Sequence, residues 1–223
     1  MSVAAAPRLQ GLALWGVLLV AGCAEAPGAR MAMIDNAATV IGPEATLDPA
    51  APPADWFAGP GAGRSFAVVD RDGHRAIEVR GAETALGRRL SVPLLAAPFL
   101  RWAWRVEPGG AESGVRLIVG LERRGAAPAR PPSRLELALI GTAGGARVTA
   151  SLDGGRPVLL RRADPQASAT WLIEAIDLAA LLRQLSPTPP DGELSVAFVA
   201  VGGVGRRGDA RALGQVAEVV LSR

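Results

Sequence analysis

Segments in which apolar and polar residues alternate fill most of the chain after residue 56, and they constrain the fold more than any other feature of the sequence. The clearest is FLRWAWRV, residues 99–106, in which every second residue from Leu100 to Val106 is apolar and the positions between them include Arg101 and Arg105. A period of two residues is that of a β-strand with one buried face. The same alternation, or a strand-like composition, marks the ranges 66–69, 76–80, 86–92, 115–122, 135–140, 147–152, 158–160, 171–176, 194–201 and 215–221. We therefore predict a mostly β fold.

Residues that favour tight turns separate these segments. The sequence DRDG at residues 70–73 stands between two apolar strands and predicts a β-hairpin, and glycine-containing turns follow at 108–110 and 153–155. Many short strands with turns between them are typical of a β-sandwich or a barrel. One short helix is expected at residues 178–185, with Asp177 as its N-terminal cap and a proline-rich stretch after it.

The first 22 residues have the pattern of an export signal and are set apart from the fold. Arg8 precedes the apolar run at 11–20, which is shorter than the roughly 20 residues that a membrane-spanning helix needs. The sequence VAGC, which ends at Cys23, resembles the lipobox of bacterial lipoproteins, in which small residues precede a cysteine. The resemblance implies cleavage before Cys23, a diacylglyceryl group on its thiol and acylation of the new amino terminus. The alternative is an ordinary secretory signal that is cleaved near Ala24.

The residues around this cysteine also predict a location. Cys23 is the only cysteine of the chain, so it has no disulfide partner within the chain, and acyl chains on it would hold the protein at a membrane. In enterobacteria an aspartate after the lipidated cysteine retains a lipoprotein in the inner membrane. Ala24 at this position therefore favours the periplasmic face of the outer membrane, with the cell surface as an alternative.

The composition of the next segment predicts a tether. Residues 23–55 are rich in Ala, Pro and Gly, and we expect them to form the lipid anchor and a flexible linker, with the β-sandwich domain at 56–223. The apolar patch at 38–41 could instead be a first strand of the fold.

The charge composition excludes one class of function. All 24 basic residues are Arg, against 21 acidic residues, and the formal net charge is +3. This balance is not the basic footprint of a nucleic-acid-binding protein. Hydrophobic residues make up 49% of the chain, which together with the low net charge argues against disorder.

Three blocks together resemble a family of exported bacterial proteins whose domain has no assigned function. They are the hairpin around Asp72 and Gly73 with the segment 84–90 (TALGRRL), the strand 100–106 (LRWAWRV), and the strands 194–201 and 215–221. The family carries a W-x-W-[RK]-V strand. The resemblance covers about residues 56–221 and implies an antiparallel β-sandwich of the lectin-like jelly-roll kind. Two Asp-rich sites of the family are replaced here by AESG at 111–114 and VGRRG at 204–208, so a site formed by those aspartates would be lost or changed.

Charged residues on the polar sides of the strands form the main candidate for a binding site. If strand 99–106 pairs with strand 114–122 and the sheet continues in chain order, one face collects six charged side chains. These are Arg101, Arg105, Arg116, Glu122, Glu136 and Arg147. Guanidinium groups suit the oxygens of carboxylate, phosphate or sulfate, so such a face could bind an anionic glycan. The alternative is a solvated face with cross-strand Arg–Glu pairs.

Two tryptophans share one side of the strand 99–106. A pair such as Trp102 and Trp104 could stack on a sugar, but Leu100 and Val106 lie on the same side. We therefore predict that both tryptophans belong to the core.

His74 is the only histidine of the chain. With Asp70 and Asp72 it could imitate a metal corner, but a polar hairpin turn is the favoured interpretation. No His/Cys spacing typical of zinc sites is present, and Cys23 is expected to be acylated. The sequence therefore predicts no metal and no cofactor.

Paired carboxylates are the remaining enzymatic possibility. Lectin-like sandwiches include glycoside hydrolases, which need two carboxylates about 5–9 Å apart. Closely spaced acids on one strand, which those enzymes carry, do not occur here, and Glu136 and Glu174 each stand alone among apolar residues. We favour a protein without catalytic activity, with a carbohydrate-active enzyme as an alternative.

Taken together, these patterns predict a lipid-anchored, periplasm-facing β-sandwich that binds or scaffolds. Its partner would be an anionic envelope glycan or another envelope protein, and acyl chains on Cys23 would attach it to the membrane. A structural subunit of an envelope assembly is a further alternative, which an exposed apolar patch or sheet edge would favour.

Overall fold

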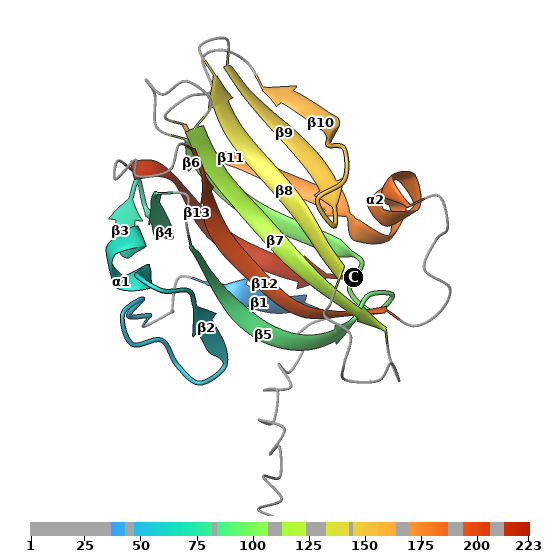
Figure 1. The fold of residues 1–223 in the computed structure, drawn as a ribbon, viewed down its shortest axis with the longest axis horizontal. Helices are drawn as coiled ribbons and strands as arrows, with labels where there is room; N and C mark the ends of the chain where they lie inside the picture. The colour runs from blue at the N-terminus through green and yellow to red at the C-terminus, as the bar shows by residue number, and fades with distance from the viewer. Residues whose placement is uncertain are drawn as a thin grey trace, which may run out of the picture.

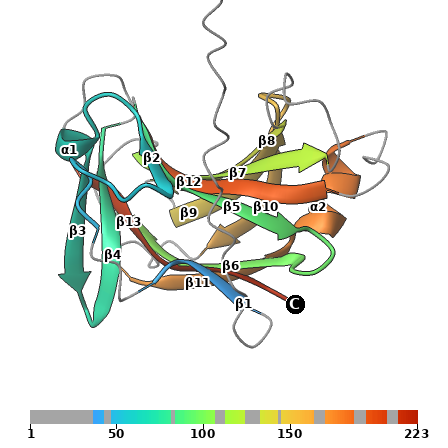
Figure 2. The same cartoon turned by 90° about the horizontal axis from the view of Figure 1, so that it is seen from below.

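The computed structural model describes residues 37–42, 47–81, 84–106, 113–123, 133–142, 145–163, 170–186, 194–205 and 212–223. In these ranges the chain forms two antiparallel sheets that lie face to face (Figure 1, Figure 2). The predicted mostly β fold, an antiparallel sandwich, is confirmed.

Sheet A contains both the first and the last strand of the fold. Its order is β11 (Leu172–Asp177), β6 (Phe99–Val106), β13 (Ala212–Ser222), β4 (His74–Arg80) and β3 (Phe66–Arg71), and β1 (Ala37–Ile41) pairs with β13 off this path. The β3–β4 hairpin has the predicted tight turn. Asp72 and Gly73 have φ angles of 51° and 81°, and positive φ at both central residues is the requirement of a type I′ turn.

Sheet B is formed by the middle of the chain and is the larger of the two. Its order is β10 (Val158–Ala163), β9 (Gly145–Leu152), β8 (Ser133–Thr142), β7 (Ser113–Arg123), β12 (Leu194–Val204), β5 (Ala85–Pro93) and β2 (Trp56–Ala58). The strands β7 to β10 pair in chain order, as predicted, while β12 inserts between β7 and β5.

The consecutive strands β6 and β7 lie in different sheets. The predicted pairing of 99–106 with 114–122 is wrong, because β6 pairs with β11 and β13, and β7 pairs with β8 and β12. Alternation identifies the apolar side of each strand, and both apolar sides do face the same core. The two strands face the core from opposite sheets. Alternation of apolar and polar residues is the same in two strands that are neighbours in one sheet and in two strands that face each other across the core, so it cannot distinguish the two arrangements.

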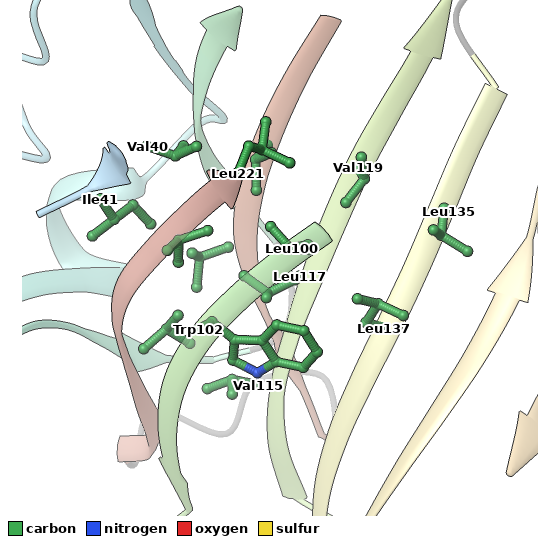
Figure 3. Packing of buried hydrophobic residues seen from close by; sticks show 14 of the residues in the cluster. Val40, Ile41, Leu100, Trp102, Val115, Leu117, Val119, Leu135, Leu137 and Leu221 are labelled. Atoms are coloured by element: carbon green, nitrogen blue, oxygen red, sulfur yellow. The ribbon is translucent and has the colours of Figure 1, made fainter. Parts of the chain in front are cut away.

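Inner side chains of both sheets fill one continuous core, part of which Figure 3 shows. There the ring of Trp102, from sheet A, lies near Leu117 and Leu137 of sheet B. Trp102 and Trp104 are 1% and 0% exposed, which confirms that they are core residues and leaves neither ring free to stack on a ligand.

The fold begins before residue 56, where the linker was predicted to end. Ala38, Val40 and Ile41 of β1 are buried, and β1 pairs along its length with β13. Leu47 and Trp56 are buried as well. The apolar patch at 38–41 is therefore the first strand of the fold rather than part of a flexible tether.

The helix α2 (Leu178–Leu185) has the predicted bounds and cap. The backbone N–H of Ala180 donates to Oδ1 of Asp177 over 2.9 Å, and Leu178, Leu181 and Leu182 are buried against the core. A second, four-residue helix, α1 (Ala62–Ser65), was not predicted.

Several sequence predictions concern residues outside the described ranges. They are the export signal at 1–22, Cys23 and Ala24 of the lipobox, the linker residues 25–36, the turn at 108–110, and residues 111–112 and 206–208 of the two segments where Asp-rich sites of the family are replaced. Within the described ranges, no helix has both the length and the apolar character that a membrane crossing requires.

Candidate functional site

The six residues of the predicted charged face are divided between the two outer faces of the sandwich. Arg101 and Arg105 lie in β6 of sheet A, whereas Arg116 and Glu122 in β7, Glu136 in β8 and Arg147 in β9 lie in sheet B. Outer faces of a sandwich point away from each other, so no single ligand can contact the whole set. The prediction that these residues share one face is therefore wrong, because they lie on two opposite outer faces.

On sheet B, the predicted cross-strand pairing of opposite charges is present. Nη1 of Arg116 lies 3.6 Å from Oε2 of Glu136, and both side chains are about one-third exposed. The register sets Ile118, rather than Arg116, directly opposite Glu136, so the two charged residues are diagonal neighbours. The pair thus lies on the solvent side of the sheet.

Aromatic side chains lie on this same outer face, which the sequence prediction missed. Phe198 of β12 is directly opposite Gly120 of β7, and a Cβ on residue 120 would come within 2.1 Å of the Phe198 ring. Phe57 of β2 is opposite Gly87 of β5, where a Cβ would come within 2.5 Å of the Phe57 ring. Each half-buried ring therefore occupies space that a glycine leaves open on the neighbouring strand.

The two rings pack against each other and against a cation. The ring centroids of Phe57 and Phe198 are 5.3 Å apart at an interplanar angle of 86°, an edge-to-face contact. The guanidinium carbon of Arg89 lies 5.4 Å from the centroid of Phe57, within the range of a cation–π contact. Nη1 of Arg89 also donates to the carbonyl oxygen of Trp56 over 2.9 Å, which holds this exposed side chain beside the ring.

The side chain of Arg116, like the two phenylalanine rings, lies over a glycine of the neighbouring strand. A Cβ on Gly202 of β12 would come within 2.9 Å of Nε of Arg116. Between these larger side chains the sheet carries small or buried residues, including Ala200 and Ile118. We call the set Phe57, Arg89, Arg116, Glu136 and Phe198 the sheet B patch.

The sheet B patch combines three kinds of contact. Half-buried aromatic rings offer apolar surface to the C–H faces of a sugar or a similar ring. Two guanidinium groups offer donors suited to carboxylate, phosphate or sulfate oxygens. Arg147 lies on the same sheet, in β9 opposite Ile140, and Glu122 lies further along β7. The patch therefore offers apolar surface and charged hydrogen-bonding groups side by side on one sheet face.

The outer face of sheet A has a different construction, in which charged groups hold the β3–β4 hairpin. Nη1 of Arg105 donates to Oδ2 of Asp72 over 2.6 Å, and Nε1 of Trp171 donates to the carbonyl oxygen of Arg71 over 3.3 Å. These contacts connect the hairpin tip to β6 and to the residue that precedes β11. Arg105 therefore has a structural contact with the hairpin tip.

His74 belongs to this second network. Its Nδ1 shares a 2.8 Å hydrogen bond with Oε1 of Glu218, and its ring centroid lies 4.7 Å from that of Trp171. Asp70 pairs instead with Arg75, at 3.4 Å. Among the residues that the structure describes, no three His, Cys, Asp or Glu side chains gather as a metal site would require.

Glu136 and Glu174, the two acids that stand alone among apolar residues in the sequence, lie in different sheets. Glu136 in sheet B is paired with Arg116, and Glu174 in sheet A accepts a 2.6 Å hydrogen bond from Nη1 of Arg161. Each carboxylate is thus engaged by an arginine.

Glycines inside strands were the sequence signal for the missed aromatic residues. Gly87 and Gly120 interrupt segments with strand composition, and a glycine in a strand often marks a close approach of another group. The signal indicates the position of a close approach but not which side chain makes it.

Comparisons with known proteins give little to add to this geometry. No family model and no curated protein matches the chain. Among solved structures, one described as a sialidase of Trypanosoma rangeli in complex with 2,3-difluorosialic acid, a covalent intermediate, is similar with 14% identity and a TM-score of 0.31. The match covers 85% of this chain and 31% of the sialidase chain, so the chain spans about a third of that protein. Similarity at this level supports no inference about activity.

Proposed function

We propose that the protein is a lipid-anchored envelope protein that faces the periplasm and binds an anionic glycan on the sheet B patch without catalysing a reaction. The observation that supports this proposal is the association of two half-buried phenylalanine rings with two arginines on one outer sheet face. Lipid anchoring rests on the lipobox sequence that ends at Cys23.

The chemistry of the patch favours a sugar with acidic groups over a neutral one. Phe57 and Phe198 can contact an apolar ring face, while the exposed Arg89 is held next to Phe57 by its bond to the Trp56 carbonyl. The Arg116 side chain remains about 29% exposed while it is paired to Glu136, so part of this side chain is open to solvent. A ligand with alternating ring faces and carboxylates or phosphates would use both kinds of group.

Retention on isolated envelope polysaccharide tests the binding site. We expect the full chain to be retained. Phe198→Ala or Arg89→Ala should raise the dissociation constant about tenfold, which corresponds to a loss of about 1.4 kcal/mol of binding free energy. A polysaccharide whose carboxylates have been reduced to alcohols should retain the protein less strongly.

Arg101→Ala is the matched control. Arg101 is an exposed arginine of the predicted charged face, but it lies on sheet A, so its removal should leave retention unchanged. Failure of the wild-type protein to be retained, or equal losses for Arg89→Ala and Arg101→Ala, would argue against the sheet B patch as the binding site.

Mass spectrometry of the mature protein tests the anchor. We expect an amino-terminal Cys23 that carries acyl chains, and a Cys23→Ser variant that is recovered in the soluble fraction instead of the membrane fraction. A mature terminus near Ala24 without lipid would contradict the anchor and support ordinary secretion.

A further inference from the structure

One end of the sandwich brings the start of the fold together with exposed apolar side chains. Ala37, the first residue of β1, is paired with Ser222, and Ser222 is paired with Phe99 at the start of β6. The connection 94–98, which carries Leu95, joins β5 of sheet B to β6 of sheet A at this end, as Figure 2 shows beside the carboxyl terminus. Leu95 is 80% exposed and Phe99 is 41% exposed. We call this region the tether end.

The tether end lies close in sequence to the predicted anchor. Thirteen residues, 24–36, separate Cys23 from Ala37. A flexible segment of that length has an end-to-end distance of about 20 Å, and even fully extended it spans only about 45 Å. The anchor would therefore hold the tether end near the membrane surface.

The side chains at the tether end fit such a position. Leucine and phenylalanine are residues that enter the boundary between headgroups and acyl chains. Arg101, exposed two residues after Phe99, carries the charge that anionic headgroups attract. Leu95 and Phe99 do not belong to the core, since the Leu95 side chain is exposed on the connection 94–98 and Phe99 lies on the outer side of β6.

We propose that the tether end is a membrane-docking surface, on which Leu95 and Phe99 enter the headgroup region of the bilayer that holds the Cys23 acyl chains. The proposal rests on the lipid anchor of the proposed function. Docking at this end leaves the outer face of sheet B on the side of the sandwich rather than against the membrane, because β5 and β12 of sheet B have one end here, where Pro93 pairs with Ser195.

Depth-dependent quenching tests the docking. Leu95→Cys and Phe99→Cys variants of the lipidated full chain are labelled with an environment-sensitive fluorophore and placed in vesicles of phosphatidylethanolamine and phosphatidylglycerol. Acylation occupies the Cys23 thiol, so the introduced cysteine is the only free thiol of the chain. We expect lipids brominated on their acyl chains to quench both labels by at least about half.

Leu159→Cys is the matched control. Leu159 in β10 is 46% exposed, similar to Phe99. The pairing of successive strands across sheet B places Leu159 level with Ala85, which lies at the opposite end of β5 from the connection that carries Leu95. Its label should not be quenched.

Each outcome of this experiment has one meaning. Quenching at positions 95 and 99 without quenching at 159 supports docking. An acylated protein whose labels at 95 and 99 are unquenched, or quenched no more than at 159, overturns docking and leaves the anchor intact. A protein whose Cys23 carries no lipid by mass spectrometry overturns the anchor and docking together.

Discussion

Phe198 lies so close to Gly120 on the neighbouring strand that a Cβ on residue 120 would come within 2.1 Å of the Phe198 Cε1 atom. Real side chains do not tolerate that approach, so a Gly120→Ala substitution must displace the ring or the strand. We expect it to lower the free energy of unfolding by about 1–3 kcal/mol, measured by urea denaturation. Retention on envelope polysaccharide should fall as well, because the displaced ring belongs to the sheet B patch.

A double-mutant cycle isolates this contact. In a Phe198→Ala background the space above residue 120 is empty, so adding Gly120→Ala should cost little further stability. The two substitutions should therefore show a coupling free energy of about 1 kcal/mol or more. Additive effects would mean that the glycine is needed for some reason other than the ring.

Glu218 holds a backbone conformation that costs energy for any residue with a Cβ. Its φ angle is 51°, at the point where the pairing of β13 with β6 is interrupted between Ala217 and Val220. Glu218→Gly and Glu218→Ala both remove the hydrogen bond to His74, but only glycine relieves the left-handed strain. We expect the glycine variant to be more stable than the alanine variant by about 1 kcal/mol in thermal or urea unfolding. Equal stabilities, or a more stable alanine variant, would show that the bulge stores no such strain.

A substitution of Trp102 tests whether this residue has a structural role or a binding role. The side chain is buried, and Nε1 has no hydrogen-bond partner among the described residues, so Trp102→Phe removes volume without breaking a hydrogen bond. We expect a loss of about 1–2 kcal/mol in stability and no change in polysaccharide retention at a temperature where the variant is folded. Weaker retention by the folded variant would indicate that Trp102 contributes to ligand binding.

The elements of this fold could be predicted because their signals are local. The period of two residues in β6 depends on one strand and its solvent side, and the cap of α2 depends on Asp177 and Ala180 alone. The pairing of strands depends instead on which distant segments fill the space beside them. The insertion of β12 between β7 and β5 therefore has no counterpart in the alternation of any single strand.

The candidate site was predictable in part for a related reason. Arg116 and Glu136 were expected together because β7 and β8 are neighbours in the chain as well as in the sheet. Phe198 was missed because β12, with the sequence LSVAFVAVGGV, is apolar on both sides and shows no period of two. Phe57 was missed because β2 has only three residues, too few for a pattern.

Arg88 and Arg161 link the two sheets in different ways, and lysine substitutions should tell them apart. From β5 of sheet B, Arg88 donates to Oδ2 of Asp55 over 2.7 Å and to the carbonyl oxygens of Thr39 and Val40 in β1 of sheet A, over 3.2 and 3.3 Å. A lysine ammonium is a single point of charge and cannot reach all three acceptors in the same way as the guanidinium fork. We expect Arg88→Lys to lower the free energy of unfolding by about 1–2 kcal/mol.

Arg161→Lys is the comparison for that substitution. From β10, at the other side of sheet B, Arg161 donates from Nη1 to Glu174 of sheet A over 2.6 Å, and the two side chains are 49% and 12% exposed. A lysine can supply one charged donor, so the stability measured by urea denaturation should stay within about 0.5 kcal/mol of wild type. Similar losses for the two variants would show that the number of acceptors around Arg88 does not set its contribution.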